Sequence, residues 1–156
     1  MENYTGKGDW MIENIVEGLN VDRITSGYVI DHIKAGFGLT IYKHLKLDEL
    51  NNSVALIQNV KSSKHGRKDI IKIQGLINID MDMLGYIDPN ITVIIVKDGE
   101  VQDKKFLSLP DILKGVVKCK NPRCITSTEA GLEQQFKLAD RDKKVYRCVF
   151  CEQENK

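Results

Sequence analysis

Four cysteines are the residues of this 156-residue chain best suited to chemistry, and all of them lie in its last quarter. They form the pairs Cys119-x4-Cys124 and Cys148-x2-Cys151, with 23 residues between the pairs. A structural zinc ion takes four thiolates at about 2.3 Å in tetrahedral geometry, and two short cysteine loops side by side supply that set. Because no additional His or Cys accompanies the pairs, the site would be closed, as structural zinc sites are. We therefore expect one structural zinc ion per chain.

Other interpretations of the cysteines stay open: disulfides, a C-x2-C redox pair, free thiols, or iron in a rubredoxin-like site. No segment approaches the ~20 apolar residues of a membrane span, and the polar N-terminus lacks the apolar core of a signal peptide. We therefore expect a soluble cytoplasmic protein, in which thiols stay reduced and structural disulfides are rare. The region also lacks the βαβ pattern of a thioredoxin-like pair, so zinc is favoured.

A second group of polar residues lies in the segment GRKDIIKI, residues 66–73. In a strand, side chains alternate between two faces, so Lys68 and Lys72 share one face and Asp69 lies on the other. The two lysines would be about 13 Å apart at ~3.3 Å per residue, which suits an elongated anion such as a nucleoside triphosphate. Solvent-facing lysines on a half-exposed strand are the alternative, and the pattern alone favours that alternative.

Asp31 and His32 follow the apolar run Tyr28–Ile30. Asp31 can accept hydrogen bonds from ribose hydroxyls, and His32 can donate to a phosphate. Alternatively, Asp31 caps the helix expected after it. The sequence contains no GxSxG motif, no glycine-rich phosphate loop and no evident nucleophile beside the pair. The two residues therefore predict binding rather than catalysis.

Alternating strands and helices must position these residues over residues 19–110. Strands are predicted at residues 21–25, 28–30, 53–60, 68–76 and 91–96, and apolar residues of helical period predict a helix over residues 34–47. A short helix is expected over residues 80–86, and Asp98-Gly99 predicts a hairpin turn. This order is typical of an α+β domain of ferredoxin-like type, here followed by a small β-rich zinc-binding domain.

Charge and proline mark the boundary between the two domains. The chain has 23 basic and 22 acidic residues, a balance that argues against a polybasic nucleic-acid coat. Residues 1–112 hold 13 basic and 16 acidic residues, and the remainder holds 10 and 6. Pro110 ends any regular element before this shift. We therefore expect a flexible leader over residues 1–18, one domain over 19–112 and a zinc-binding domain over 113–156.

Three segments together resemble the regulatory chain of aspartate carbamoyltransferase: residues 27–33 (GYVIDHI), residues 66–73, and Ser-Leu-Pro at 108–110 leading into the two cysteine pairs. The likeness runs from about Leu19 to Gln153. It implies a non-catalytic subunit of pyrimidine biosynthesis whose N-terminal α+β domain binds CTP and ATP and forms a homodimer. It also implies a zinc domain that docks on the catalytic chain, with neither nucleic acid nor membrane as a partner.

The resemblance also implies a role for individual residues of a nucleotide site. The residues that match phosphate contacts are His32, Lys68 and Lys104. The residues that match contacts with ribose and base are Asp31 and Lys72, with Ile24 and Val29 as apolar contacts with the base. The resemblance therefore favours a ligand-binding role for Lys68, Lys72 and Lys104 over the solvent-facing role that the pattern alone favours.

Three further positions matter for the resemblance. Asn121 lies in the first cysteine loop, where the family has an asparagine that touches the catalytic chain, and Arg123 replaces a second loop asparagine. Ile94 stands where the family has an asparagine near the base.

The residues leave two other functions open. A zinc ribbon that binds nucleic acid would use the basic residues of the last domain, which are Lys118, Lys120, Arg123, Arg141, Lys143, Lys144 and Arg147. A thiol redox enzyme would use Cys148 or Cys151 as its nucleophile. Both rank below the regulatory chain, because the order and spacing of three separate segments are more specific than a basic surface or one cysteine pair.

Overall fold

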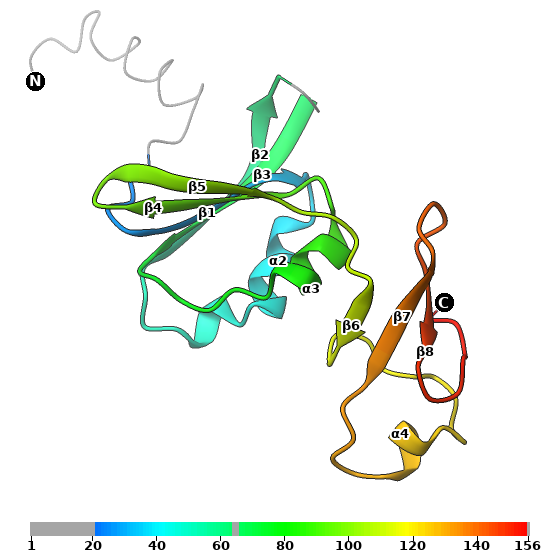
Figure 1. The fold of residues 1–156 in the computed structure, drawn as a ribbon. Helices are drawn as coiled ribbons and strands as arrows, with labels where there is room; N and C mark the ends of the chain where they lie inside the picture. Colours follow the sequence, from blue (N-terminus) through cyan, green and yellow to red (C-terminus); the bar gives the residue numbers. More distant parts are fainter. Residues whose placement is uncertain (1–20, 64–65, 156) are drawn as a thin grey trace, which may run out of the picture. The chain divides into compact units, whose positions relative to one another are not determined.

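The computed structural model describes residues 21–63 and 66–155 (Figure 1). The expected leader over residues 1–18 lies outside these described residues. The chain divides into two compact units: unit 1 takes the residues up to Asn78 together with Thr92–Lys105, and unit 2 takes Ile79–Ile91 together with Phe106–Lys156. The boundary expected near residue 112 stays a prediction.

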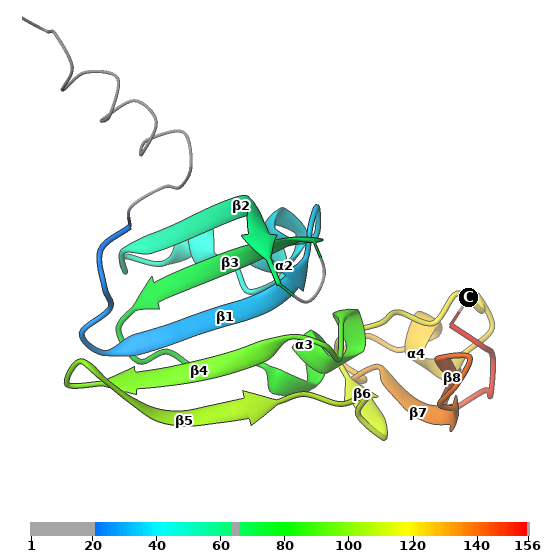
Figure 2. The same cartoon turned by 90° about the horizontal axis from the view of Figure 1, so that it is seen from above.

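Unit 1 is built on a five-stranded sheet in the order β2-β3-β1-β4-β5, which Figure 2 shows from above. The strands are β1 (Gly27–Lys34), β2 (Val54–Ser62), β3 (Gly66–Gln74), β4 (Thr92–Lys97) and β5 (Glu100–Phe106). The central pairings β1–β3, β1–β4 and β2–β3 are antiparallel. Helix α2 (Gly38–His44) follows β1, and helix α3 (Met81–Ile87) follows β3. Along the chain, this is the split βαβ order of a ferredoxin-like domain, although α3 belongs to unit 2, and the predicted α+β class is confirmed.

One face of the sheet forms the core of unit 1. Ile30 of β1 and Ile71 and Ile73 of β3 are fully buried, as the period of two in their strands requires. Helix α2 packs on β2 and β3 and buries Ile41, and the short 3-10 helix η1 (Leu47–Glu49) buries Leu47. The opposite face of β3 carries Lys68 and Lys72, as the alternation predicted.

Two local predictions were wrong. The helix expected over residues 34–47 is shorter, because β1 continues to Lys34 and Gly36 has a φ of 96°, a backbone angle that helices do not use. The strand expected over residues 21–25 does not form. Instead, the carbonyl of Thr25 accepts the N–H of Gly99, and the Ser26 hydroxyl accepts the N–H of Asp98. These bonds tie the segment to the β4–β5 turn, whose positive φ angles fit the predicted Asp-Gly hairpin.

Two β-bulges interrupt the strands on either side of β3. The register shifts between Ile30 and Ile33 in β1 and between Ile57 and Val60 in β2. The bulges contain His32, with a φ of 57°, and Asn59, with a φ of 62°. A bulge re-aims the side chains of its strand, so both shifts change which groups face the outer side of the sheet.

A buried carboxylate holds these irregular segments in place. Asp69 of β3 is fully buried, and its Oδ2 accepts the N–H groups of Gly36 at 3.0 Å and Gly38 at 2.9 Å. Its Oδ1 accepts the N–H of Asn59 at 2.8 Å. A Cβ on Gly38 would lie 2.8 Å from Asp69 Oδ2, so only glycine fits this approach. Asp69 therefore joins the β1–α2 connection and the β2 bulge to β3.

Unit 2 contains a three-stranded antiparallel sheet in the order β6-β7-β8. Its strands are β6 (Ile112–Lys114), β7 (Gln135–Asp140) and β8 (Val145–Cys148), and its helices are α3 and α4 (Ile125–Thr128). Leu113, Phe136 and Tyr146 form its core with Cys124 and Cys148.

Aromatic and polar contacts attach α3 to this sheet. The rings of Tyr86 and Tyr146 meet edge to face, with centroids 5.4 Å apart. The Tyr86 hydroxyl accepts a hydrogen bond from Asn155 at 3.0 Å, and the Tyr146 hydroxyl donates to the carbonyl of Pro110 at 2.7 Å. Unit 2 therefore has a small apolar core in which two of the four cysteines are core residues.

The substitution Asp69→Asn tests the role of the buried carboxylate. The NH2 group of an asparagine side chain donates hydrogen bonds and cannot accept them, so at least one of the three N–H groups loses its partner. We expect the free energy of unfolding to fall by about 2 kcal/mol in urea denaturation. Asp48→Asn, which removes the same charge from exposed η1, should change it by less than about 0.5 kcal/mol. Equal effects of the two substitutions would contradict the role of Asp69.

Candidate metal centre and anion-binding face

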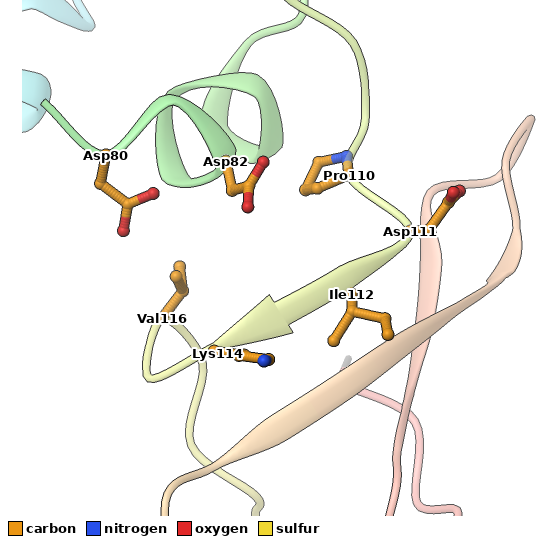
Figure 3. A pocket seen from close by; sticks show the side chains of 7 residues that line it. All are labelled: Asp80, Asp82, Pro110, Asp111, Ile112, Lys114 and Val116. Atoms are coloured by element: carbon orange, nitrogen blue, oxygen red, sulfur yellow. The ribbon is translucent and has the colours of Figure 1, made fainter.

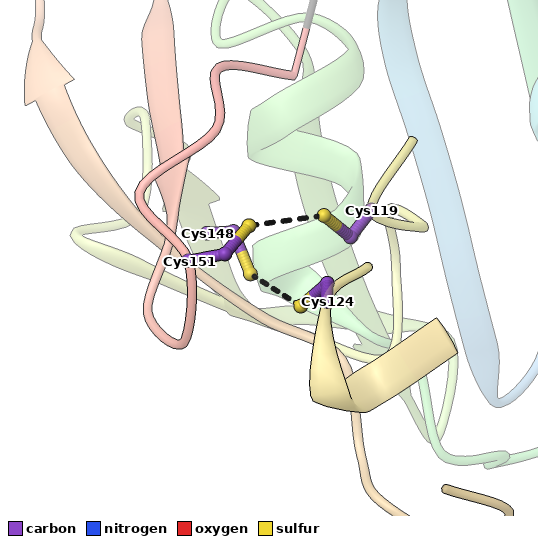
Figure 4. Close-up of side chains that lie close together, drawn as sticks. All are labelled: Cys119, Cys124, Cys148 and Cys151. Atoms are coloured by element: carbon purple, nitrogen blue, oxygen red, sulfur yellow. Dashed lines mark hydrogen bonds between the residues drawn. The ribbon is translucent and has the colours of Figure 1, made fainter. Parts of the chain in front are cut away.

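The four cysteines converge from two separate loops of unit 2 (Figure 4). Cys119 and Cys124 lie in the loop between β6 and α4, and Cys124 is the N-cap of α4. Cys148 ends β8, and Cys151 lies in the turn that follows. The four sulfur atoms all lie within 4.8 Å of one another. The spacing in the sequence therefore predicted the cluster correctly.

The sulfur geometry fits a tetrahedral ion. Cys119 Sγ lies 3.5 Å from Cys151 Sγ, and Cys124 Sγ lies 3.8 Å from Cys148 Sγ. Four sulfurs at about 2.3 Å from a central zinc ion would be about 3.8 Å apart. A disulfide would need about 2.05 Å, and all four thiols are free. The cluster consists of cysteines alone within the described part of the chain, so it fits one closed, structural zinc per chain.

Hydrogen bonds shape the two cysteine loops. The carbonyl of Asn121 accepts the N–H of Cys124 at 3.1 Å, and its side-chain Oδ1 accepts the N–H of Arg123 at 3.0 Å. The hydroxyl of buried Thr126 lies 3.1 Å from Cys124 Sγ, where it can donate to a thiolate. Asn121 thus stabilises the first loop, whereas the Arg123 side chain is exposed.

The crowded thiols resist ionisation without a cation. Burial raises the pKa of Cys119 to about 12, and burial likewise raises the pKa of Cys148. In contrast, the backbone N–H of Gln153 lowers the pKa of Cys151 to about 7. A bound divalent ion reverses this balance, because a coordinating thiol loses its proton. Zinc binding therefore releases protons, and protons compete with zinc.

Zinc affinity should for this reason rise with pH. Because burial and the neighbouring thiols favour the protonated form of Cys119 and Cys148, zinc should be retained near pH 7.5 and released as the pH falls toward about 4. Metal release can be followed with a zinc-sensitive dye, with circular dichroism reporting the loss of unit 2 structure in parallel. Zinc content that does not change between these pH values would contradict the tetrathiolate site.

A second set of predicted residues meets on the outer face of the unit 1 sheet. Val29 of β1 lies directly opposite Lys72 of β3 on one side and Ile94 of β4 on the other. Lys68 Nζ lies 2.8 Å from Asp31 Oδ1, and each of these two side chains is only 17% exposed. The structure thus joins two cations, a carboxylate and an apolar strip into one surface, which we call the anion-binding face after the role that the sequence predicts for it.

His32 completes this face through the β1 bulge. Its backbone N–H donates to Asp31 Oδ1 at 2.6 Å, and its Nδ1 lies 4.0 Å from Asp31 Oδ2. The alternative role of Asp31 as a helix cap is wrong, because the N-cap of α2 is Phe37 and the N–H of Gly38, the first residue of α2, is accepted by Asp69. Burial by itself raises the pKa of Asp31, but the Lys68 ammonium and the His32 N–H outweigh it and leave the pKa below its usual value. Asp31 is therefore ionised at neutral pH.

The remaining residues predicted for the nucleotide site have fewer polar contacts with this face. Lys72 is half-buried, and it has no hydrogen-bond or ion-pair partner among the described residues. Ile24 is half-buried in the segment before β1, and Lys104 is exposed on β5. Within the described residues, no hydrogen bond or ion pair joins Lys104 to Asp31 or Lys68.

Sequence reasoning missed the role of Asp69. It placed this residue on the apolar face of its strand and assigned it no contact. A carboxylate among isoleucines on a core-facing strand is a signal in itself, because a buried charge needs hydrogen-bond partners. The glycines at 36 and 38 indicate where backbone N–H groups can approach that closely.

A pocket of about 500 Å³ lies in unit 2. Figure 3 shows the residues that line it, which are Asp80, Asp82, Pro110, Asp111, Ile112, Lys114 and Val116. Two of its three carboxylates already have structural partners. Asp80 caps α3 by accepting the N–H of Met83, and Asp111 forms a 2.8 Å ion pair with Arg141. Neither pair requires a ligand.

The chain matches two family models over nearly its whole length. Residues 19–108 match "Aspartate carbamoyltransferase regulatory chain, allosteric domain", and residues 111–156 match "Aspartate carbamoyltransferase regulatory chain, metal binding domain". In residues 21–63 and 66–155, no helix is long and apolar enough to cross a membrane.

Curated relatives agree with these matches. A regulatory chain of aspartate carbamoyltransferase from Clostridium botulinum is 47% identical over 135 residues, which cover 86% of this chain and 92% of the relative. The regulatory chain from Clostridium tetani is 48% identical over 136 residues, which cover 86% of this chain and 94% of the relative. The regulatory chain from Bifidobacterium longum is 41% identical over 138 residues, which cover 88% of this chain and 99% of the relative. A regulatory chain is the non-catalytic subunit of its enzyme. The predicted resemblance is confirmed, and the chain belongs to the family of aspartate carbamoyltransferase regulatory chains, with an allosteric domain and a metal-binding domain.

Proposed function

We propose that this regulatory chain binds CTP and ATP on the anion-binding face and so controls a catalytic chain of aspartate carbamoyltransferase in the cytoplasm. The observation that carries the proposal is the gathering of Asp31, Lys68 and Lys72 beside an apolar strip on one face of the sheet. Lys68 and Lys72 are four residues apart on β3, about 13 Å along the strand. That distance suits a nucleotide that lies with its phosphates at one lysine and its base at the other.

Each residue has a part in this arrangement that its chemistry supports. Lys68, His32 and Lys104 donate charge-assisted hydrogen bonds to the phosphates. Asp31 accepts from ribose hydroxyls, and Lys72 donates to an acceptor on the base. The apolar contacts with the base come from Val29 and Ile24. Ile94, opposite Val29, adds a further apolar group to the same strip.

Regulation in this proposal follows from thermodynamic linkage between nucleotide binding and the activity state of the enzyme. A nucleotide shifts an enzyme between low- and high-activity states only by binding one state more tightly, and the coupling is typically about 1–3 kcal/mol. CTP would favour the low-activity state and ATP the high-activity state. Two regulatory chains would pair through their nucleotide-binding domains and bridge catalytic trimers.

The zinc domain supplies the docking surface for the catalytic chain in this proposal. Asn121 and Arg123 lie in the first cysteine loop, and Arg123 is exposed. Ile125, Val149 and Phe150, next to cysteines in the sequence, are each more than 40% exposed. A surface with apolar side chains around polar loop residues is typical of a protein interface.

The alternative function, nucleic-acid binding by a zinc ribbon, loses three of its basic residues to internal contacts. Arg141 pairs with Asp111 at 2.8 Å, and Arg147 pairs with Glu154 at 2.7 Å. The Lys144 ammonium lies 4.7 Å from the centre of the Tyr86 ring. These residues stabilise unit 2, so the basic surface is smaller than the sequence indicated.

Lys72→Ala tests nucleotide binding on the anion-binding face. Calorimetric titration should show that the intact chain binds CTP and ATP and that added salt weakens the affinity for both nucleotides. The substitution Lys72→Ala should weaken the affinity for CTP about tenfold. Lys97→Ala, on the exposed last residue of β4, is the matched control and should leave CTP affinity unchanged. If neither nucleotide binds, or if both variants bind CTP like the wild type, this face is not the effector site.

Cys148→Ser tests the zinc domain as the docking surface. Loss of one of four ligands should cost the chain its zinc and its association with catalytic trimers, because the metal organises both cysteine loops. CTP binding to the same variant should persist, which shows that unit 1 is still folded. Gel filtration with purified catalytic trimers gives the readout, and intact assembly without zinc would exclude this role.

A further inference from the structure

The side chain of Gln134 connects the two ends of the first cysteine loop. This residue lies directly before β7 and is half-buried. Its Oε1 accepts the backbone N–H of Cys119 at 3.0 Å, and its Nε2 donates to the carbonyl of Thr126 at 3.3 Å. One amide group thus bonds to the first cysteine of the pair and to the residue two positions after the second cysteine, Cys124.

The contacts continue from Thr126 to the second sulfur atom. Thr126 is buried, and its hydroxyl lies 3.1 Å from Cys124 Sγ. A hydroxyl that donates to a thiolate orients the sulfur and stabilises its charge. The two cysteines of the first pair are therefore joined through Gln134 and Thr126 as well as through the chain between them.

An amide is the side-chain group that suits this position. Oε1 faces a donor and Nε2 faces an acceptor, so only one orientation of the amide satisfies both bonds. A carboxylate could accept from Cys119, but it would set a second negative oxygen against the carbonyl of Thr126. The backbone of Gln134 is also fixed, because its carbonyl accepts the N–H of Gly115 at 2.8 Å.

The second cysteine pair is held in a different way. The N–H of Cys148 donates to the carbonyl of Gln153 at 2.9 Å, and its carbonyl accepts the N–H of Glu152 at 2.8 Å. These backbone bonds form a short turn directly after β8, which keeps Cys148 and Cys151 close together. In contrast, residues 115–124 contain no helix and no strand, so the first pair depends more on side-chain contacts.

We propose that Gln134 is a positioning residue of the metal centre, whose side-chain amide holds Cys119 and Cys124 at the separation that a tetrahedral ion needs. A ligand loop that is already held loses less conformational freedom when the metal binds, so the affinity for zinc is higher. Loss of such a partner outside the coordination sphere typically lowers metal affinity by about 10–100-fold.

Zinc transfer from the full-length, zinc-loaded chain to a chromogenic chelator tests this role. Gln134→Met removes both hydrogen bonds at similar side-chain volume and should lower zinc affinity about tenfold. Gln134→Glu keeps only the acceptor and should lower zinc affinity as well. Gln135→Met makes the same change at the next residue, whose side chain has no hydrogen bond among the described residues, and should retain zinc like the wild type.

Alkylation with iodoacetamide, mapped to each cysteine by mass spectrometry, separates positioning from a loss of stability. In the zinc-loaded chain, Gln134→Met should speed alkylation of the first cysteine pair about tenfold and that of the second pair less. Tyr146→Phe, which loses only the hydrogen bond to the carbonyl of Pro110, lowers the stability of unit 2 and should affect all four cysteines equally. Unchanged zinc affinity in both Gln134 variants, or equal acceleration at all four cysteines in Gln134→Met, would overturn the proposal.

Discussion

The carboxylate of Asp69 accepts hydrogen bonds from three backbone N–H groups in two segments of unit 1, and the geometry of that unit depends on this arrangement. A buried charge is tolerated only when its hydrogen bonds are satisfied, so the loop after β1 and the bulge of β2 have little freedom. Its sequence neighbour Lys68 points to the opposite face, as alternation in β3 requires. One strand thus organises the core on one face and the charge of the anion-binding face on the other.

Unit 2 depends on a different kind of interaction. Its core contains few large apolar residues, and two of the cysteines are part of that core. Burial and the neighbouring thiols raise the pKa of Cys119, so this thiol favours its protonated form, and a bound divalent ion would favour the thiolate instead. In a unit of this kind the binding free energy of the metal is also folding free energy. A bound metal would therefore stabilise any surface formed by the cysteine loops.

Patterns of side chains in the sequence predicted much of this structure, whereas the contacts made by backbone groups could not be predicted from the sequence. Cysteine spacing predicted the metal cluster, and the period of two placed Lys68 and Lys72 on one face of β3. A period cannot show where an extra residue enters a strand, so the β1 bulge at His32 was missed. The partners of Asp69 are N–H groups, which every residue except proline carries. The resemblance to a family, rather than any pattern, assigned the lysines to a ligand.

The central claim is that the outer face of the unit 1 sheet is where a nucleotide binds. A crystal structure of the zinc-loaded chain with CTP measures this most directly. The account predicts phosphate oxygens within hydrogen-bond distance of Lys68, a ribose hydroxyl at Asp31 and the base over Val29 near Lys72. A nucleotide bound anywhere else, with the Asp31–Lys68 ion pair still intact, would contradict it.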